Sequence, residues 1–117
     1  MATAQVARDY FTALGRKHGW QAFLADDLVF TSHASPGRQV SGREAYLAAT
    51  RRFFSMISAV EIRDMIVEGA KACALTRYDL QPPGGRAFRS EVAEVFGVRE
   101  GRIASLDIYF DSAPYPK

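Results

Sequence analysis

The chain has 117 residues, a hydrophobic fraction of 48% and a formal net charge of +2. This length suits one domain with a core of its own, and the composition excludes an intrinsically disordered chain. The nearly balanced charge gives no electrostatic signal for nucleic acid or for an acidic membrane surface. We therefore expect one domain over residues 1–117 that binds neither.

The single cysteine, Cys73, excludes a disulfide within the chain. Its apolar neighbours are typical of a small core residue. The first residues lack the charged and apolar regions of a signal peptide, and no apolar run approaches the ~18 residues that span a bilayer. We therefore expect a cytoplasmic protein.

The first half of the chain predicts helices and one strand. Apolar side chains at every fourth position predict a helix over residues 3–16, followed by a brief second helix. A β-branched and aromatic run predicts a strand over residues 28–33. Ser41 and Glu44 have the spacing of a capping box, and a wide apolar stripe behind them predicts a third helix.

The second half changes to a period of two, which is typical of strands. We expect strands at about 60–68, 71–81, 86–99 and 102–110. Glycine and proline turn signals separate them, and such short connections require antiparallel neighbours. Helices followed by an antiparallel meander predict an α+β domain with its helices on one face of a curved sheet.

Four stretches carry a resemblance to a known family. They are Ala25-Asp26-Asp27, Ser41-Gly42-Arg43-Glu44-Ala45, Thr76-Arg77-Tyr78-Asp79-Leu80, and the segment from Val95-Phe96 through Glu100-Gly101-Arg102-Ile103 to Tyr109-Phe110-Asp111. With the order of elements, they make the chain similar to the SnoaL-like, nuclear transport factor 2-like superfamily over nearly its whole length. In these stretches the nearest likeness is to limonene-1,2-epoxide hydrolases, and ketosteroid isomerases share the same fold.

The resemblance implies a fold and an assembly. The fold is a cone-shaped, cystatin-like α+β domain, in which N-terminal helices pack on a curved, mixed, mainly antiparallel sheet. Members of the superfamily commonly pair two subunits through the outer face of that sheet. We therefore expect a homodimer with a hydrophobic pocket in each subunit.

The hydrolase resemblance assigns two residues of a catalytic set. Arg77 and Asp79 match an Arg-x-Asp in which the Asp shares protons with a nucleophilic water and the Arg bridges to a second Asp. That second Asp falls on Ile108. The pocket Tyr and Asn that help to hold the water fall on Phe30 and Ser32, so the resemblance implies an incomplete epoxide-hydrolase set.

The isomerase resemblance assigns a different set. Tyr10 matches the tyrosine of the oxyanion hole, and Glu94 falls where the isomerases carry a protonated Asp. Their general base falls on Ser32, which cannot act as one. SnoaL-like cyclases, which use a single acid/base carboxylate, are compatible with these residues.

Strand alternation puts Arg77 and Asp79 on one face of their strand. The resemblance directs this face into the pocket, together with the face of the next strand that carries Glu94. The predicted catalytic residues are Asp79, Arg77, Glu94 and Tyr10. The predicted substrate-binding residues are Ser32, Phe30, Phe88, Val92, Phe96, Leu106, Ile108 and Phe110.

Two carboxyl groups near one guanidinium cannot ionise alike, because desolvation raises a carboxyl pKa whereas a cation lowers it. We expect one ionised acid paired with Arg77 and one protonated acid that donates a hydrogen bond. In this hypothesis Asp79 transfers the proton and Arg77 orients it. Glu94 or Tyr10 donates to the developing charge.

Structural roles compete with this hypothesis. Arg77 and Asp79 also suit a structural ion pair, and Tyr10 suits a core position with a satisfied hydroxyl. A register error of one residue would put Glu94 on the outer face. Asp107 faces away from the pocket unless a β-bulge turns it inward.

The chain has no phosphate loop, no dinucleotide fingerprint and no metal-ligand spacing, which favours chemistry without a cofactor or a metal. His33 is predicted on the strand face opposite Ser32, where it suits a surface role. The outer face of the sheet is predicted to carry Thr76, Tyr78, Arg89, Glu91, Ala93, Val95, Asp107 and Tyr109.

Three functions fit these observations. The first is cofactor-free acid/base chemistry on a small apolar molecule, by isomerisation, cyclisation, dehydration or epoxide opening. The second is binding of a small apolar ligand without catalysis. The third is a dimeric interaction module.

Overall fold

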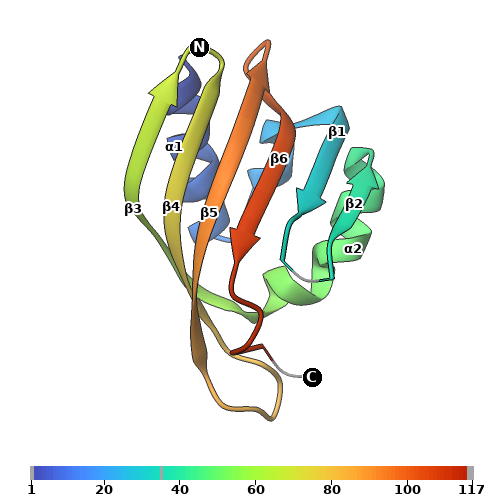
Figure 1. Ribbon diagram of the computed structural model, residues 1–117, viewed down its shortest axis with the longest axis vertical. Helices are drawn as coiled ribbons and strands as arrows, with labels where there is room; N and C mark the ends of the chain where they lie inside the picture. The colour runs from blue at the N-terminus through green and yellow to red at the C-terminus, as the bar shows by residue number, and fades with distance from the viewer. Residues whose placement is uncertain (1, 35, 116–117) are drawn as a thin grey trace.

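The computed structural model describes residues 2–34 and 36–115, which form two helices, a short 3₁₀ helix and a six-stranded sheet (Figure 1). The elements are α1 (Thr3–Gly15), η1 (Trp20–Phe23), β1 (Leu24–Ser32), β2 (Arg38–Ser41), α2 (Arg43–Met56), β3 (Ile57–Glu68), β4 (Lys71–Leu80), β5 (Phe88–Arg99) and β6 (Arg102–Phe110). The predicted helices and the four strands of the meander are therefore confirmed, with ends that shift by up to three residues.

The strands are arranged in the order β2-β1-β6-β5-β4-β3. β1 runs parallel to β6, whereas every other neighbouring pair is antiparallel. The sheet is therefore mixed and mainly antiparallel, as expected for the fold class.

Both helices lie on the same side of the sheet, behind it in the view of Figure 1, with α1 behind the β3–β5 half and α2 near β1 and β2. The apolar face of α1 is buried, and its Tyr10 and Phe11 meet Phe96 of β5 edge to face. Such edge-to-face aromatic pairs stabilise a core beyond the area that they bury. This core fills the space between α1 and the sheet.

The start of α2 differs from its prediction. Ser41 is the last residue of β2, opposite Val29 of β1, so it does not cap the helix. Gly42 takes the N-cap position without a side-chain hydrogen bond, at φ +95°. Only glycine adopts this conformation readily, and here it turns the chain from strand to helix. β2 itself was not predicted, because four residues show too little alternation.

The β5–β6 hairpin fixes the register of the two strands behind the pocket. Its two turn residues, Glu100 and Gly101, both have positive φ, at +52° and +77°. A two-residue turn of this kind matches the right-handed twist of antiparallel strands. A β-bulge in β6 between Ile103 and Ser105 then shifts the register by one residue, and the shifted register places Glu94 opposite Ile108.

Candidate functional site

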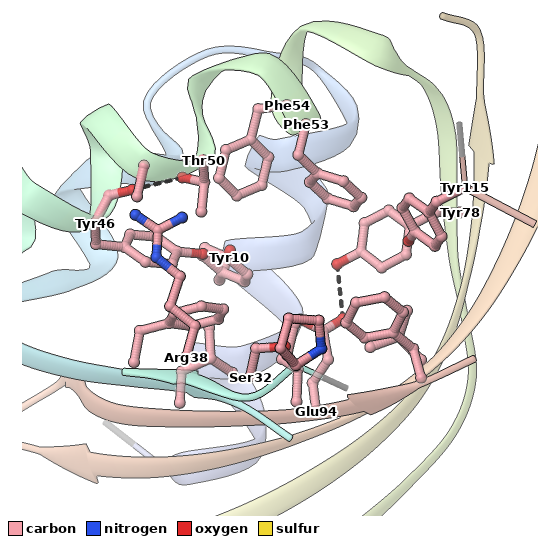
Figure 2. A pocket seen from close by; sticks show the side chains of 17 residues that line it. Tyr10, Ser32, Arg38, Tyr46, Thr50, Phe53, Phe54, Tyr78, Glu94 and Tyr115 are labelled. Carbon is pink, nitrogen blue, oxygen red and sulfur yellow. Dashed lines mark hydrogen bonds between the residues drawn. The ribbon is translucent and has the colours of Figure 1, made fainter. Parts of the chain in front are cut away.

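A pocket of about 260 Å³ lies between α2 and the sheet, and Figure 2 shows its lining. Its walls are mainly aromatic and aliphatic, with few polar groups. The lining comprises Tyr10, Phe30, Ser32, Pro36, Arg38, Tyr46, Ala49, Thr50, Phe53, Phe54, Tyr78, Val92, Glu94, Leu106, Ile108, Phe110 and Tyr115. An apolar cavity with a few convergent polar groups is the usual form of a small-molecule site, although this one is smaller than the ~300–1,000 Å³ that is typical.

Glu94 of β5 is the only carboxylic acid in this lining, and 4% of its surface is exposed. Its Oε2 accepts a hydrogen bond of 2.7 Å from the Tyr78 hydroxyl. The Thr76 hydroxyl lies 2.7 Å from the same Oε2 and 3.1 Å from the carbonyl oxygen of Val92. Two neighbouring hydroxyls on β4 therefore hold one oxygen of the carboxyl group in place.

The other carboxyl oxygen, Oε1, has no hydrogen-bond partner among the described residues. No side-chain oxygen or nitrogen among these residues is both sealed from solvent and unpaired. Oε1 is therefore open to the pocket. An oxygen with free lone pairs beside an apolar cavity is placed to exchange a proton with a bound molecule.

Burial raises the pKa of Glu94 from 4.5 to about 7, although the hydrogen bonds from Thr76 and Tyr78 oppose this shift. Desolvation disfavours the charged carboxylate, and no described residue forms an ion pair with Glu94 that would compensate it. At neutral pH the protonated and ionised forms are therefore both populated.

Three buried tyrosines surround this carboxyl group. Burial raises the pKa of Tyr10, Tyr46 and Tyr78, and the nearby charge of Glu94 adds to the effect. All three consequently keep their phenolic proton at neutral pH. Figure 2 shows Tyr10 and Tyr46 on one side of the pocket and Tyr78 beside Glu94.

Tyr115, which follows the last strand, lines the pocket. Tyr115 packs against Phe88 and Phe110, and its hydroxyl donates a hydrogen bond of 2.8 Å to Ser90 Oγ. This contact places an aromatic ring beside the β5 face that carries Glu94. It helps to make the surroundings of the carboxyl group apolar.

The sequence model of a protein family, the SnoaL-like domain, matches residues 7–106, which is most of the chain. The chain belongs to the SnoaL-like domain family. The matched segment includes Glu94, Thr76 and Tyr78. No curated protein matches this SnoaL-like domain by sequence.

Solved structures share its fold. An NTF2-like protein of unknown function from Burkholderia pseudomallei has a TM-score of 0.81 and 22% identity, over 97% of this chain and 95% of that one. A candidate ketosteroid isomerase from Kribbella flavida has a TM-score of 0.77 and 19% identity, over 98% and 82%. A candidate SnoaL-like polyketide cyclase from Jannaschia has a TM-score of 0.76 and 17% identity, over 93% and 85%.

The structure of this SnoaL-like domain brings together most of the residues that the sequence placed in the pocket. Those in its lining are Tyr10, Glu94, Phe30, Ser32, Val92, Leu106, Ile108 and Phe110. Two predicted wall residues lie elsewhere. Phe96 is fully buried against α1, and Phe88 packs against Tyr115 without lining the cavity.

Arg77 and Asp79 are not in the pocket, and their predicted inward orientation is wrong. Both lie on the outer face of β4, where Arg77 Nε is 2.7 Å from Glu91 Oε1 and Arg89 Nε is 2.8 Å from Asp79 Oδ1. The β4–β5 register pairs Tyr78 with Ser90, both of which are buried on the inner face.

The physical reason is the cost of burying charge. An inward Arg77 and Asp79 would lose hydration, whereas outward they meet charges of opposite sign directly across on β5. The buried face of β4 is formed instead by uncharged side chains at every second position, namely Ala72, Ala74, Thr76, Tyr78 and Leu80. Thr76 and Tyr78 were predicted on the outer face, and this prediction is wrong for the same reason. Cys73 lies on the outer face, half-buried.

Asp107 also stays outside the pocket. Its Oδ1 lies 2.9 Å from His33 Nε2, and the His33 ring stacks on Tyr109 at 4.3 Å. Ile108 lines the pocket instead. The bulge of β6 lies earlier, between Ile103 and Ser105, and beyond it strand alternation keeps Asp107 on the outer face, so β6 brings no second acid into the site.

Several pocket residues were not predicted. Tyr78 was missed with the face of β4, as was Thr76, which holds Glu94 from outside the lining, and Tyr46 was interpreted as part of an apolar helix stripe. Its spacing from Thr50 and Phe53 on α2 could have indicated a lining face. Arg38 was missed because β2 was missed.

Within residues 2–34 and 36–115, no group of three His, Cys, Asp or Glu side chains could hold a metal ion. None of the helices described is long and apolar enough to cross a membrane.

Proposed function

We propose that this SnoaL-like domain is a cofactor-independent acid/base catalyst for a small, largely apolar molecule, with Glu94 as the proton-transfer residue. One observation carries this proposal. Thr76 and Tyr78 hold one oxygen of a buried carboxyl group, while its other oxygen is open to an apolar pocket. Proton transfer by such a positioned group contributes about 10²–10⁴-fold in rate.

The arrangement supports chemistry in both directions. The ionised carboxylate accepts a proton from a carbon or oxygen of the substrate, and the protonated acid returns one to another position. Negative charge that develops on the substrate is met by the neutral hydroxyls of Tyr10 and Tyr46, which line the same cavity. Because the walls are apolar, these hydrogen bonds are stronger than they would be in water.

Isomerisation or cyclisation through an enolate fits this set of residues better than epoxide opening. A single carboxylate that alternates between base and acid can perform such a reaction. The similar structures include proteins named as a candidate isomerase and a candidate cyclase. The hydrolase assignment depended on Arg77 and Asp79, and both are on the outer face.

The test is whether the purified protein accelerates proton abstraction from a small neutral carbon acid, and whether Glu94→Gln removes the acceleration. A protein that only binds ligands would show equal affinity in both forms and no turnover in either. That outcome would replace catalysis with ligand binding as the function of the pocket.

We also propose that the outer face of the sheet pairs two copies of the chain. Leu75, Ala93 and Tyr109 form a row across β4, β5 and β6 on this face. Leu75 is 40% exposed and Tyr109 is 49% exposed. Val29, which is also exposed, lies on β1, the strand next to β6. Large apolar side chains gathered on one face are typical of a protein interface.

Sedimentation velocity tests the pairing. We expect the wild-type protein to sediment as a dimer at micromolar concentration, and Leu75→Glu as a monomer, because the dimer would bury an unpaired carboxylate. Val67→Glu is the matched control, since Val67 is exposed but pairs with the inward-facing Ala72. A monomeric wild-type protein, or a dimer that survives Leu75→Glu, would refute this interface.

A further inference from the structure

Four lining residues form one row across the sheet. Ser32 of β1 is paired with Arg38 of β2 on one side and with Ile108 of β6 on the other. Ile108 is in turn paired with Glu94 of β5. All four line the pocket, so their side chains leave the sheet on the same face. The row runs from a cation at one end to the carboxyl group at the other.

Among the described residues, Arg38 is the only cation in the pocket lining. Its guanidinium has no carboxylate partner among the described residues, unlike five other arginines. Those that do form ion pairs are Arg43, Arg63, Arg77, Arg89 and Arg99. Figure 2 shows the Arg38 side chain reaching over the pocket toward Tyr46 and Thr50, away from Glu94.

Ser32, paired with Arg38 across the two strands, adds a second free donor to the pocket. Its hydroxyl makes no hydrogen bond to any described residue, and directly opposed residues of antiparallel strands have Cβ atoms about 4.5–5.5 Å apart. Thr50 donates its own hydroxyl proton to the Tyr46 carbonyl oxygen at 2.7 Å. The Arg38 guanidinium and the Ser32 hydroxyl therefore both present donors to the pocket, and no described residue accepts a hydrogen bond from either.

We propose that Arg38 and Ser32 form an anion subsite that binds the carboxylate of a small, largely apolar monocarboxylic acid. The reacting carbon of this acid then lies over Ile108, next to Glu94. This placement rests on the proposed function, whereas binding of the carboxylate does not. The subsite thus names the substrate class and fixes which end of the molecule reaches the proton-transfer residue.

The length of the row limits the size of this acid. Neighbouring strands lie about 4.8 Å apart, so the Cα atoms of Ser32 and Glu94, two strands apart, are separated by about 10 Å. The Glu94 side chain shortens this gap at one end, whereas Arg38 reaches away from Glu94 at the other. One ring or a short chain between the carboxylate and the reacting carbon fills it.

The donors favour a carboxylate over a phosphate ester. A guanidinium fork and one hydroxyl match two oxygens and a single negative charge. A phosphate monoester brings a third oxygen and a second charge, and the described lining around Arg38 offers no second cation for them. Burying such a charge without a partner is costly.

Calorimetric titration with two matched probes tests the subsite. Cyclohexylacetate and its neutral isostere cyclohexylacetamide are titrated into the protein at about pH 6, where a carboxylic acid of this type is ionised. We expect the wild-type protein to bind the carboxylate roughly 5- to 30-fold more tightly than the amide, because a charge-assisted hydrogen bond is gained.

Two variants locate the effect. Arg38→Gln should bring the carboxylate affinity down to that of the amide and leave the amide affinity unchanged. Arg51→Gln, which removes an equal charge from the exposed side of α2 outside the lining, should keep the wild-type preference. Arg38 is itself exposed, so Arg38→Gln should melt at the wild-type temperature, and a thermal melt verifies its folding.

Three results would overturn the subsite: equal affinity for both probes in the wild-type protein, equal losses in Arg38→Gln and Arg51→Gln, or tighter binding of cyclohexyl phosphate than of cyclohexylacetate. None of them bears on Glu94, whose titration is measured on the ligand-free protein. Conversely, an ordinary Glu94 pKa would refute the proposed catalysis and leave a measured carboxylate preference standing.

Discussion

Glu94→Gln is expected to slow proton abstraction from a neutral carbon acid by about 10²–10⁴-fold, because glutamine cannot accept the proton. 5-Nitrobenzisoxazole is a suitable reporter. A base removes its ring C–H proton, the electron pair forms the nitrile, and the N–O bond breaks to release a coloured phenolate. The molecule is small, planar and apolar, as the pocket requires.

The pH dependence identifies the base. In the wild-type protein the rate should rise with pH through a midpoint of about 7, because only ionised Glu94 can abstract the proton. The variant should lack this step. Absorbance of the phenolate, followed across a pH series with each protein, measures both the rate and the midpoint.

Asp79→Asn provides the matched control, since it also removes one carboxylate but from the outer face of the sheet. It should keep the wild-type rate and midpoint. Loss of activity in Asp79→Asn comparable with that in Glu94→Gln would mean that the outer-face pair, and not the buried carboxyl group, performs the chemistry.

The second large effect is on stability. The unfolded chain releases the Glu94 proton near 4.5, whereas the folded protein keeps it to about 7. Between these values the folded state binds more protons than the unfolded state, so the free energy of unfolding falls as pH rises. A difference of this size corresponds to roughly 3 kcal/mol, at 1.36 kcal/mol per pKa unit.

Glutamine has no proton to lose, so Glu94→Gln should not show this decline. The stability of the variant relative to wild type should increase by roughly 3 kcal/mol between pH 4.5 and pH 8, in favour of the variant. Urea denaturation of both proteins at several pH values measures the difference. A constant difference across this range would contradict the prediction.

Tyr78→Phe tests the cause of the pKa shift in the same experiment. The Tyr78 hydroxyl stabilises the ionised carboxylate through its hydrogen bond to Oε2. Its removal should raise the Glu94 pKa further, and the decline in stability should therefore continue to a higher pH than in the wild-type protein. A decline that ends at a lower pH would show that the hydroxyl favours the neutral acid instead.

Hydrophobic periodicity was sufficient to predict α1 and the four strands of the meander. The amphipathic stripe of α1 and the clear turns around Gly69 and Gly101 each admit one interpretation. β2 gave no such signal, because four residues at a sheet edge are held mainly by backbone pairing with β1. The Ser41–Glu44 pattern was misleading for the same reason, since the pairing holds Ser41 in a strand.

The candidate site was predicted in part, and the error came from one strand. Alternation defines two faces of β4 but does not say which face is buried. The hydrolase-like motif favoured the face of Arg77 and Asp79, whereas the cost of burying two charges and the opposite charges on β5 favour the face of Thr76 and Tyr78. On β5 the resemblance directed the face of Val92, Glu94 and Phe96 inward, and the structure buries these three side chains.

The ionisation of Glu94 in the folded, ligand-free protein is the most direct test of the proposed chemistry. Carbon-13 NMR of the side-chain carboxyl carbon, assigned by its absence in Glu94→Gln, follows this group alone as the pH changes. A titration midpoint of about 7 is the predicted result. A midpoint at the ordinary glutamate value of about 4.5 would mean that the pocket does not hold a proton-transfer group poised for neutral pH.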